Sequence, residues 1–212
     1  MSSIETTTAT ERYRERCEDR VAVLNDGDRT VIVVADGAGG MGAGDLAAES
    51  VVQEITSAYQ SIHSADDWAN LLRQIDCQIS AGESTAVVVD IRPYGIAGAS
   101  VGDSQAWMID EGEIVSLTAE QNRKPLLGSG QAIPVGFNQP PLHGILVAGT
   151  DGFFDYAKRD DIIRLLSTCD FYEISRKFVD LVRLPSGALW DDIGIVTARK
   201  KPAHRTRKKY EI

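Results

Sequence analysis

The segment that most constrains this chain is VIVVADGAGGMGAG, residues 31–44. Residues 31–35 are small or β-branched and predict a buried strand, the glycines that follow end regular structure, and residues 45–59 resume as a helix. Asp36 therefore stands at the end of a buried strand, beside glycines that let an ion or a ligand approach the backbone closely. This arrangement indicates a cation site.

The same glycines permit another interpretation, since Gly37, Gly39 and Gly42 fit the G-x-G-x-x-G pattern of dinucleotide-binding folds. That fold requires a second strand ending in an acid about 20 residues further on, whereas residues 45–60 and 66–80 have helical patterns. Asp36 would also repel a pyrophosphate. A P-loop is excluded because no Lys-Ser/Thr pair follows the glycines. A tight turn with an exposed aspartate remains the alternative to a cation site.

Length and composition favour one domain, because 212 residues, 43% of them hydrophobic, can bury one sizeable core. Residues 199–212 hold seven of the 22 basic residues and one of the 31 acidic ones, which leaves 15 bases and 30 acids in residues 1–198. Such an acidic body would repel nucleic-acid phosphates, so we do not expect a nucleic-acid partner.

Neither a membrane segment nor a disulfide framework is expected. No apolar run approaches the ~20 residues needed to cross a bilayer, and the polar N-terminus lacks the pattern of a signal peptide. The three cysteines are far apart and form no C-x-x-C pair, so we expect them to be reduced and structural. We therefore expect a cytoplasmic protein.

Hydrophobic periodicity predicts a mixed chain of helices and strands. A turn at residues 25–28 should join the strands at 21–24 and 31–35 into a hairpin, which brings Glu18 and Asp19 near Asp36. The other predicted elements are helices at 43–60, 66–80, 160–166 and 171–184, and strands at 85–91, 95–101, 105–110, 114–117, 145–148 and 193–198.

The connections make three further predictions. The four strands between residues 85 and 117 are joined by short turns and should form one antiparallel meander. Residues 118–143 are rich in proline and glycine and should form a surface segment beside the sheet. Residues 1–10, rich in Ser and Thr, are expected to be disordered.

Four aspartates each lie next to one end of a predicted strand: Asp36, Asp103, Asp151 and Asp191. Carboxylates gathered at close range repel one another, and divalent cations relieve that repulsion. Ligation by oxygen alone favours Mg²⁺ or Mn²⁺. Two such ions about 3.5 to 4 Å apart are used to hydrolyse phosphate esters. The sequence therefore predicts a metal-dependent phosphohydrolase.

At this point a family resemblance supports the chemistry. The ordered motifs ERCEDR, VVADGAGG, GESTAVVV, ASVGDSQAWMI, VAGTDGFFD and WDDIGIV span residues 12–199 and resemble the metal-dependent PP2C family of serine/threonine protein phosphatases. The resemblance implies an α+β fold, a four-layer αββα sandwich of two antiparallel sheets flanked by helices. The expected divisions are an N-terminus at 1–10, a phosphatase domain at 11–199 with a shortened flap at about 118–143, and a basic tail at 200–212.

The resemblance also implies a centre of two Mn²⁺ or Mg²⁺ ions. Asp36 would bridge them, and the backbone carbonyl of Gly37 would bind one of them. Asp151 and Asp191 would complete the binuclear site. Asp103 would bind a third, weaker ion.

The N-terminal motif supplies the remaining roles that the resemblance implies. Glu18 would reach a metal through water, and Asp19 would orient the nucleophilic water. Arg14 falls where the family has a phosphate-binding arginine, whose guanidinium can hold two phosphate oxygens. Arg12 and Arg16 remain alternatives, because the register of this segment is not fixed by the sequence.

Two positions depart from the family pattern. Ala38 stands where many members have a histidine that is thought to protonate the leaving group, which predicts slow turnover of unactivated esters. Asp192 replaces the common asparagine after the last metal-binding acid and is expected to support the neighbouring ligands. The short segment at 118–143 should leave the site open.

The sequence thus predicts hydrolysis of phosphoserine and phosphothreonine by direct attack of a metal-activated water, in bacterial kinase and phosphatase signalling. The expected partners are a phosphoprotein substrate and a cognate Ser/Thr kinase or its targets. A catalytically weak phosphoprotein-binding module on the same fold is the alternative. A cysteine phosphatase is excluded, since no cysteine starts a C-x₅-R motif.

Overall fold

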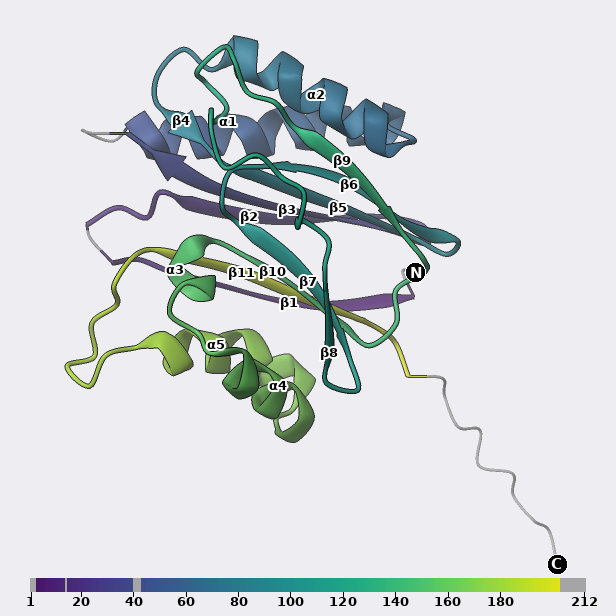
Figure 1. Ribbon diagram of the computed structural model, residues 1–212, viewed down its shortest axis with the longest axis vertical. Helices are drawn as coiled ribbons and strands as arrows, with labels where there is room; N and C mark the ends of the chain where they lie inside the picture. Colours follow the sequence, from purple (N-terminus) through teal and green to yellow (C-terminus); the bar gives the residue numbers. More distant parts are fainter. Residues whose placement is uncertain (1–2, 14, 40–42, 203–212) are drawn as a thin grey trace, which may run out of the picture.

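The computed structural model describes residues 3–13, 15–39 and 43–202. Two antiparallel sheets pack face to face, and helices cover the outer face of each (Figure 1). The predicted α+β sandwich with four αββα layers is therefore confirmed. None of the described helices is both long and apolar enough to cross a membrane.

Each sheet draws its strands from distant parts of the chain. The first sheet has the spatial order β1 (Ile4–Glu11), β11 (Ile193–Lys200), β10 (Ile145–Gly149), β7 (Gln105–Asp110) and β8 (Glu113–Ser116). The second has the order β2 (Asp19–Asp26), β3 (Arg29–Ala38), β5 (Ala86–Arg92), β6 (Gly95–Val101) and β9 (Val135–Gln139), with β4 (Glu83–Ser84) paired to β3.

The helices divide between the two outer layers. The second sheet is covered by α1 (Ala43–Ala58) and α2 (Ala65–Gln78), with the short η2 (Tyr59–Ser61) between them. The first sheet is covered by α3 (Asp151–Phe154), α4 (Arg159–Thr168), η3 (Phe171–Glu173) and α5 (Ile174–Val182). The four long helices α1, α2, α4 and α5 lie where the sequence periodicity predicts them.

Strand β3 shows why its sequence is apolar without interruption. Val31, Val33 and Ala35 pack toward α1 and α2, whereas Ile32 and Val34 pack into the layer between the sheets. Successive side chains of a strand point to opposite faces, so a strand covered on both faces has no polar alternation. All five side chains are fully buried.

The predicted hairpin is confirmed, and its register matters for the site. Strands β2 and β3 pair antiparallel, with Asp19 directly opposite Asp36. Because the pairing is continuous from these two residues to the turn, the two carboxyl groups are held at the same end of the sheet.

The prediction of one meander for residues 85–117 is wrong. Strands β5 and β6 belong to the second sheet, whereas β7 and β8 belong to the first. The chain crosses between the sheets at Gly102, whose φ of 106° is a conformation that residues with a side chain rarely adopt. The crossing places Asp103 at the junction of the two sheets.

The prediction of disorder over residues 1–10 is also wrong for the described part. Strand β1 pairs with β11 along its whole length. Hydroxyl groups reinforce the pairing, since Thr7 Oγ1 lies 2.6 Å from Ser175 Oγ and 2.7 Å from Thr197 Oγ1. The predicted basic tail at 200–212 begins inside β11, because this strand extends to Lys200. Residues 203–212 lie outside the described part.

Residues 118–143 are more than a surface segment. They include β9, which pairs with β6, and the fully buried Leu127 and Leu142. The buried carboxylate of Asp76 on α2 accepts hydrogen bonds from the backbone N–H groups of Gly128 at 2.8 Å, Gly130 at 2.9 Å and Ala132 at 2.9 Å. This single side chain therefore anchors the loop to the helix.

Replacing Asp76 with asparagine should lower the free energy of unfolding by about 2 kcal/mol, because hydrogen bonds to a charged group contribute roughly 1.5 to 3 kcal/mol. Urea denaturation measures this change. Asp66→Asn, at an exposed position on the same helix, is the control and should change the midpoint little. An unchanged midpoint in the Asp76 variant would show that other contacts hold the loop.

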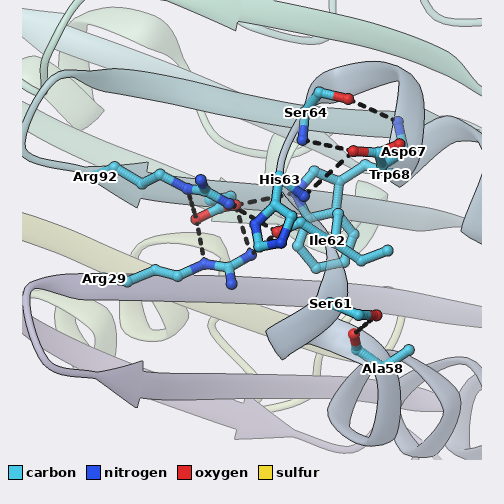
Figure 2. Close-up of polar contacts among 10 residues, drawn as sticks. Arg29, Ala58, Ser61, Ile62, His63, Ser64, Asp67, Trp68 and Arg92 are labelled. Atoms are coloured by element: carbon cyan, nitrogen blue, oxygen red, sulfur yellow. Dashed lines mark hydrogen bonds and ion pairs between the residues drawn. The ribbon is translucent and has the colours of Figure 1, made fainter.

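A buried ion cluster lies at the end of β3 and β5 that is farthest from Asp36 (Figure 2). The Asp90 carboxylate is fully buried and accepts hydrogen bonds from Arg29 Nη2 at 2.7 Å, Arg92 Nη2 at 2.8 Å and Trp68 Nε1 at 3.2 Å. Both arginines also donate to the carbonyl of Ile62, at 3.0 and 2.8 Å. The cluster thus fixes the α1–α2 connection to the sheet.

Candidate metal centre

A cavity of about 770 Å³ opens at the end of the sandwich where Asp36 lies. Both sheets contribute to its wall, through β3 and the turn after β6 on one side and through the residues flanking β10 and β11 on the other. Its acidic lining residues are Glu15, Glu18, Asp36, Asp103, Asp151, Asp191 and Asp192.

Three of these acids form a compact cluster. Asp36, Asp103 and Asp151 each offer a carboxylate oxygen, and the three oxygens lie within 4.8 Å of one another. Asp36 comes from β3, Asp103 from the crossing between the sheets, and Asp151 from the start of α3. The cluster therefore joins the two sheets.

The electrostatics of the cluster favour a bound cation. Burial, followed by the charges of Asp19 and Asp151, raises the pKa of Asp36 to about 10. Burial and the neighbouring charges of Asp103 and Asp191 also raise the pKa of Asp151. A divalent cation would remove this conflict by compensating the carboxylates. The donors are all oxygen atoms, so the residues present fit Mg²⁺ or Mn²⁺.

Asp19 lies behind this cluster and is held from the other sheet. Its carboxylate is buried, and its Oδ2 accepts a hydrogen bond from Thr150 Oγ1 at 2.7 Å. Thr150 Oγ1 in turn accepts from the N–H of Gly194 at 3.0 Å. Burial raises the pKa of Asp19 to about 7, even though the Thr150 hydrogen bond acts in the opposite direction.

Asp192 holds the N-terminal segment of the wall. One of its carboxylate oxygens accepts the N–H of Tyr13 and the other accepts the N–H of Glu18, both at 2.6 Å. Its own N–H donates to Asp191 Oδ1 at 2.9 Å. A single side chain thus ties the segment that carries Glu18 to the strand that follows Asp191.

Glycine is required where β3 meets α1. A Cβ atom at Gly37 would overlap the carbonyl oxygen of Gly44, so the strand and the helix could not approach as they do. The N–H of Gly37 donates to the carbonyl of Glu18 at 3.2 Å. The glycines after Asp36 thus allow close packing around the acid.

A threonine between β4 and β5 supports the backbone at Asp36. The N–H of Asp36 donates to Thr85 Oγ1 at 3.0 Å, and the same hydroxyl lies 2.7 Å from Ser104 Oγ. Thr85 therefore connects the strand that carries Asp36 with the turn that carries Asp103. Thr85 and Thr150 both stand in the motifs of the sequence, but a motif does not show which hydroxyl contacts which acid.

Most of the predicted site residues line this one pocket: Glu18, Asp36, Gly37, Asp103, Asp151, Asp191 and Asp192. Asp19 does not line the pocket but lies opposite Asp36 in the neighbouring strand. Arg14 lies outside the described residues. Of its alternatives, Arg16 lines the pocket and lies 3.7 Å from Asp45, whereas Arg12 donates to the carbonyl of Glu15 at 3.2 Å. Lys124 also lines the pocket, although no sequence motif indicates it.

Comparison with known proteins identifies relatives of both the sequence and the fold. The sequence profile of the family described as Protein phosphatase 2C matches residues 8–126. No sequence among the curated proteins compared matches the chain.

Among solved structures, a mutant of a bacterial serine phosphatase has a TM-score of 0.81 at 23% identity, over 92% of this chain and 97% of the other. A serine/threonine phosphatase of Staphylococcus aureus has a TM-score of 0.79 at 20% identity, over 95% and 96%. The catalytic domain of the phosphatase PstP, in complex with two manganese ions, has a TM-score of 0.75 at 17% identity, over 92% and 97%. These similarities show a shared fold.

Proposed function

Because the chain belongs to the protein phosphatase 2C family, we propose that it hydrolyses phosphoserine and phosphothreonine in proteins at a centre of two Mn²⁺ or Mg²⁺ ions. The observation that carries this proposal is the cluster of three carboxylate oxygens, contributed by both sheets, within 4.8 Å of one another. The two manganese ions in the PstP structure support it by analogy of fold.

The proposed ligands follow from the family resemblance and from their position in the pocket. Asp36 would be shared between the two ions, with Asp151, Asp191 and the carbonyl of Gly37 completing the centre. Asp103 would hold a third, weaker ion. The ions, when bound, would supply an activated water as nucleophile and compensate charge on the phosphoryl oxygens.

The chain's own residues would position the reactants. Thr150 fixes the carboxylate of Asp19, which would orient the attacking water. Asp192 fixes the backbone at Glu18, whose carboxylate would accept a hydrogen bond from a water in the pocket. Arg14 would bind two phosphate oxygens, and Arg16 in the pocket wall is the alternative.

Proton delivery to the leaving group is the weak part of this site. Ala38 lines the pocket at the position where a histidine would be expected, and it has no proton to donate. The leaving oxygen would therefore take its proton from water, which favours slow turnover of substrates with poor leaving groups. This observation supports the second candidate function, a phosphoprotein-binding module with weak catalysis.

Release of p-nitrophenol from p-nitrophenyl phosphate tests the proposal. We expect turnover with Mn²⁺, its loss with EDTA, and its recovery when excess Mn²⁺ is added. The same addition should stabilise the folded protein by about 2.7 kcal/mol at a free concentration of 100 times Kd. Metal stabilisation without turnover would favour the binding module, and equal turnover in EDTA would contradict the metal centre.

Substrate class requires a separate measurement. Three peptides that differ only in phosphoserine, phosphothreonine or phosphotyrosine should be compared by phosphate release in Mn²⁺. We expect release from the first two. Preference for phosphotyrosine would contradict the proposed specificity. A Ser/Thr kinase that acts on the same proteins would be the functional counterpart of this phosphatase.

A further inference from the structure

Two aromatic rings lie beside the acidic pocket and remain exposed. Trp190 directly precedes Asp191, and Tyr156 follows α3, which begins at Asp151. The rings stack, with their centroids 5.7 Å apart and their planes 7° from parallel. Even so, 54% of Trp190 and 45% of Tyr156 are exposed to solvent. Aromatic surface next to a site is typical of places where a partner binds.

The surroundings of these rings are negatively charged. Burial, followed by the charges of Asp191, Asp151 and Asp155, raises the pKa of Tyr156. Asp155 is exposed and lines a second hollow of about 330 Å³ together with Asp103, which also lines the main pocket. This hollow therefore adjoins the main pocket at Asp103, and it also contains Arg123, whose guanidinium lies 3.4 Å from the Asp103 carboxylate.

Metal binding would leave part of this charge in place. Asp151 and Asp191 belong to the proposed centre, so bound cations would compensate them. Asp155 is not among the proposed ligands, and within the described ranges it forms no ion pair. A negative charge next to a pair of exposed aromatic rings thus persists in the metal-loaded protein.

We propose that Tyr156, Trp190 and Asp155 form a subsite for an arginine side chain that flanks the phosphorylated residue of the substrate. The inference rests on the proposed function and narrows its substrates to phosphoproteins with a basic flank. A guanidinium is attracted to the face of an aromatic ring and pairs with a carboxylate at the same time. The chain already contains such a contact, since the guanidinium of Arg199 lies 4.2 Å from the centroid of Phe171.

Phosphopeptides test the subsite. Three series carry arginine, leucine or glutamate at each position from three before to three after a phosphoserine, and kcat/KM is measured with Mn²⁺. We expect arginine to be preferred over leucine by about 5-fold or more at one position, because a cation–π contact and a carboxylate pair act together. Glutamate at that position should be the poorest substrate, since Asp155 would repel it.

Variants assign the preference to the proposed residues. Asp155→Asn and Trp190→Ala should each reduce the preference for arginine to about 2-fold or less. Tyr94→Ala is the matched control, because Tyr94 is an aromatic side chain with 92% exposure in the turn at the opposite end of β5, and it should keep the full preference. Asp155 is a surface residue, so its variant keeps the test valid if Trp190→Ala fails to fold.

Fluorescence gives a second measurement that does not depend on activity. Trp68 and Trp107 are buried, so Trp190 dominates the exposed tryptophan signal of the described residues. An arginine-containing peptide should change this signal in the wild-type protein, and Trp190→Phe should abolish the change.

The outcomes separate the subsite from the proposed function. If the wild-type protein releases phosphate neither from the peptides nor from p-nitrophenyl phosphate, the proposed function is wrong. If it releases phosphate but does not distinguish the flanking residues, the subsite is wrong. The subsite is also wrong if leucine is preferred, or if the preference for arginine survives in both variants.

Discussion

Asp36→Asn should reduce phosphatase turnover by about 1,000-fold or more and, in the metal-free protein, raise the melting temperature. Asp36 is the proposed shared ligand, and metal ions contribute several kcal/mol to transition-state stabilisation, at about 1.4 kcal/mol for each tenfold in rate. Without metal, the same carboxylate opposes folding, because burial and neighbouring acids disfavour its charge. We expect the melting temperature to rise by about 3 °C or more, which corresponds to about 1 kcal/mol at this chain length.

The pH dependence provides a specific check on the stability effect. The pKa of Asp36 is raised to about 10 in the folded metal-free protein, above the value of about 3.9 in an unfolded chain. The folded state therefore retains a proton that the unfolded state loses, and stability falls as the pH rises between these values. The advantage of the asparagine variant should thus be absent below about pH 4 and grow toward neutral pH.

Calorimetry in EDTA across this pH range, together with turnover in Mn²⁺, measures both effects. Asp28→Asn, at an exposed position in the turn of the same hairpin, is the control and should change neither quantity. Turnover that persists in the Asp36 variant would contradict its role as shared ligand. A melting temperature that falls at neutral pH would contradict the electrostatic account.

Asp90→Asn should lower the free energy of unfolding by about 3 to 5 kcal/mol, the cost of breaking a buried ion pair from one side. The substitution leaves the guanidinium groups of Arg29 and Arg92, which are 13% and 28% exposed, without a charged partner. In the wild-type protein, burial acts to raise the pKa of Asp90, but the hydrogen bonds and charges of the two arginines outweigh it and hold the pKa below its ordinary value. This contribution to stability is lost when the pH falls through that lowered pKa.

Urea denaturation at neutral pH measures the Asp90 effect, and an exposed pair offers a matched control. Arg20 and Glu49 also form a pair at 2.7 Å, but Glu49 is 44% exposed. Glu49→Gln should therefore cost less than about 1 kcal/mol. Equal losses in the two variants would show that burial does not decide the strength of these pairs.

Much of the fold could be predicted from local sequence patterns. The apolar run at 31–35 predicts a strand buried on both faces, and the turn at 25–28 predicts its hairpin partner. The stripe of apolar residues in α2 predicts a helix packed on a sheet. These patterns depend on local periodicity and turn chemistry, which a single sequence contains.

The errors concern contacts between distant residues. Strand β1 has few large apolar side chains, and its partner β11 lies at the other end of the sequence, so no local pattern announces the pairing. The turn between β6 and β7 is as short as a hairpin turn, and only its backbone geometry at Gly102 reveals that it crosses between sheets. Such a turn places Asp103 within reach of acids from both sheets.

In the candidate site, too, the sequence predicts some residues and not others. The acids could be predicted because each stands at or beside one end of an apolar strand: Asp36 lies near the end of its strand, Asp103 and Asp151 follow strands, and Asp191 precedes one. The residues that support these acids could not be predicted, because the contacts of Thr150 with Asp19 and of Thr85 with Asp36 join residues that are far apart in the sequence. The role of Arg14 stays a prediction.

Because the carboxylate cluster lies at the seam between the sheets, substitutions far from it can alter metal affinity. Asp36 and Asp151 belong to opposite halves of the sandwich, so their separation depends on how the halves are aligned. A substitution in the buried layer, for example at Val34 or Leu146, could shift that alignment and weaken metal affinity without altering any ligand. Metal affinity would then depend on how the side chains between the two sheets pack, as well as on the ligands themselves.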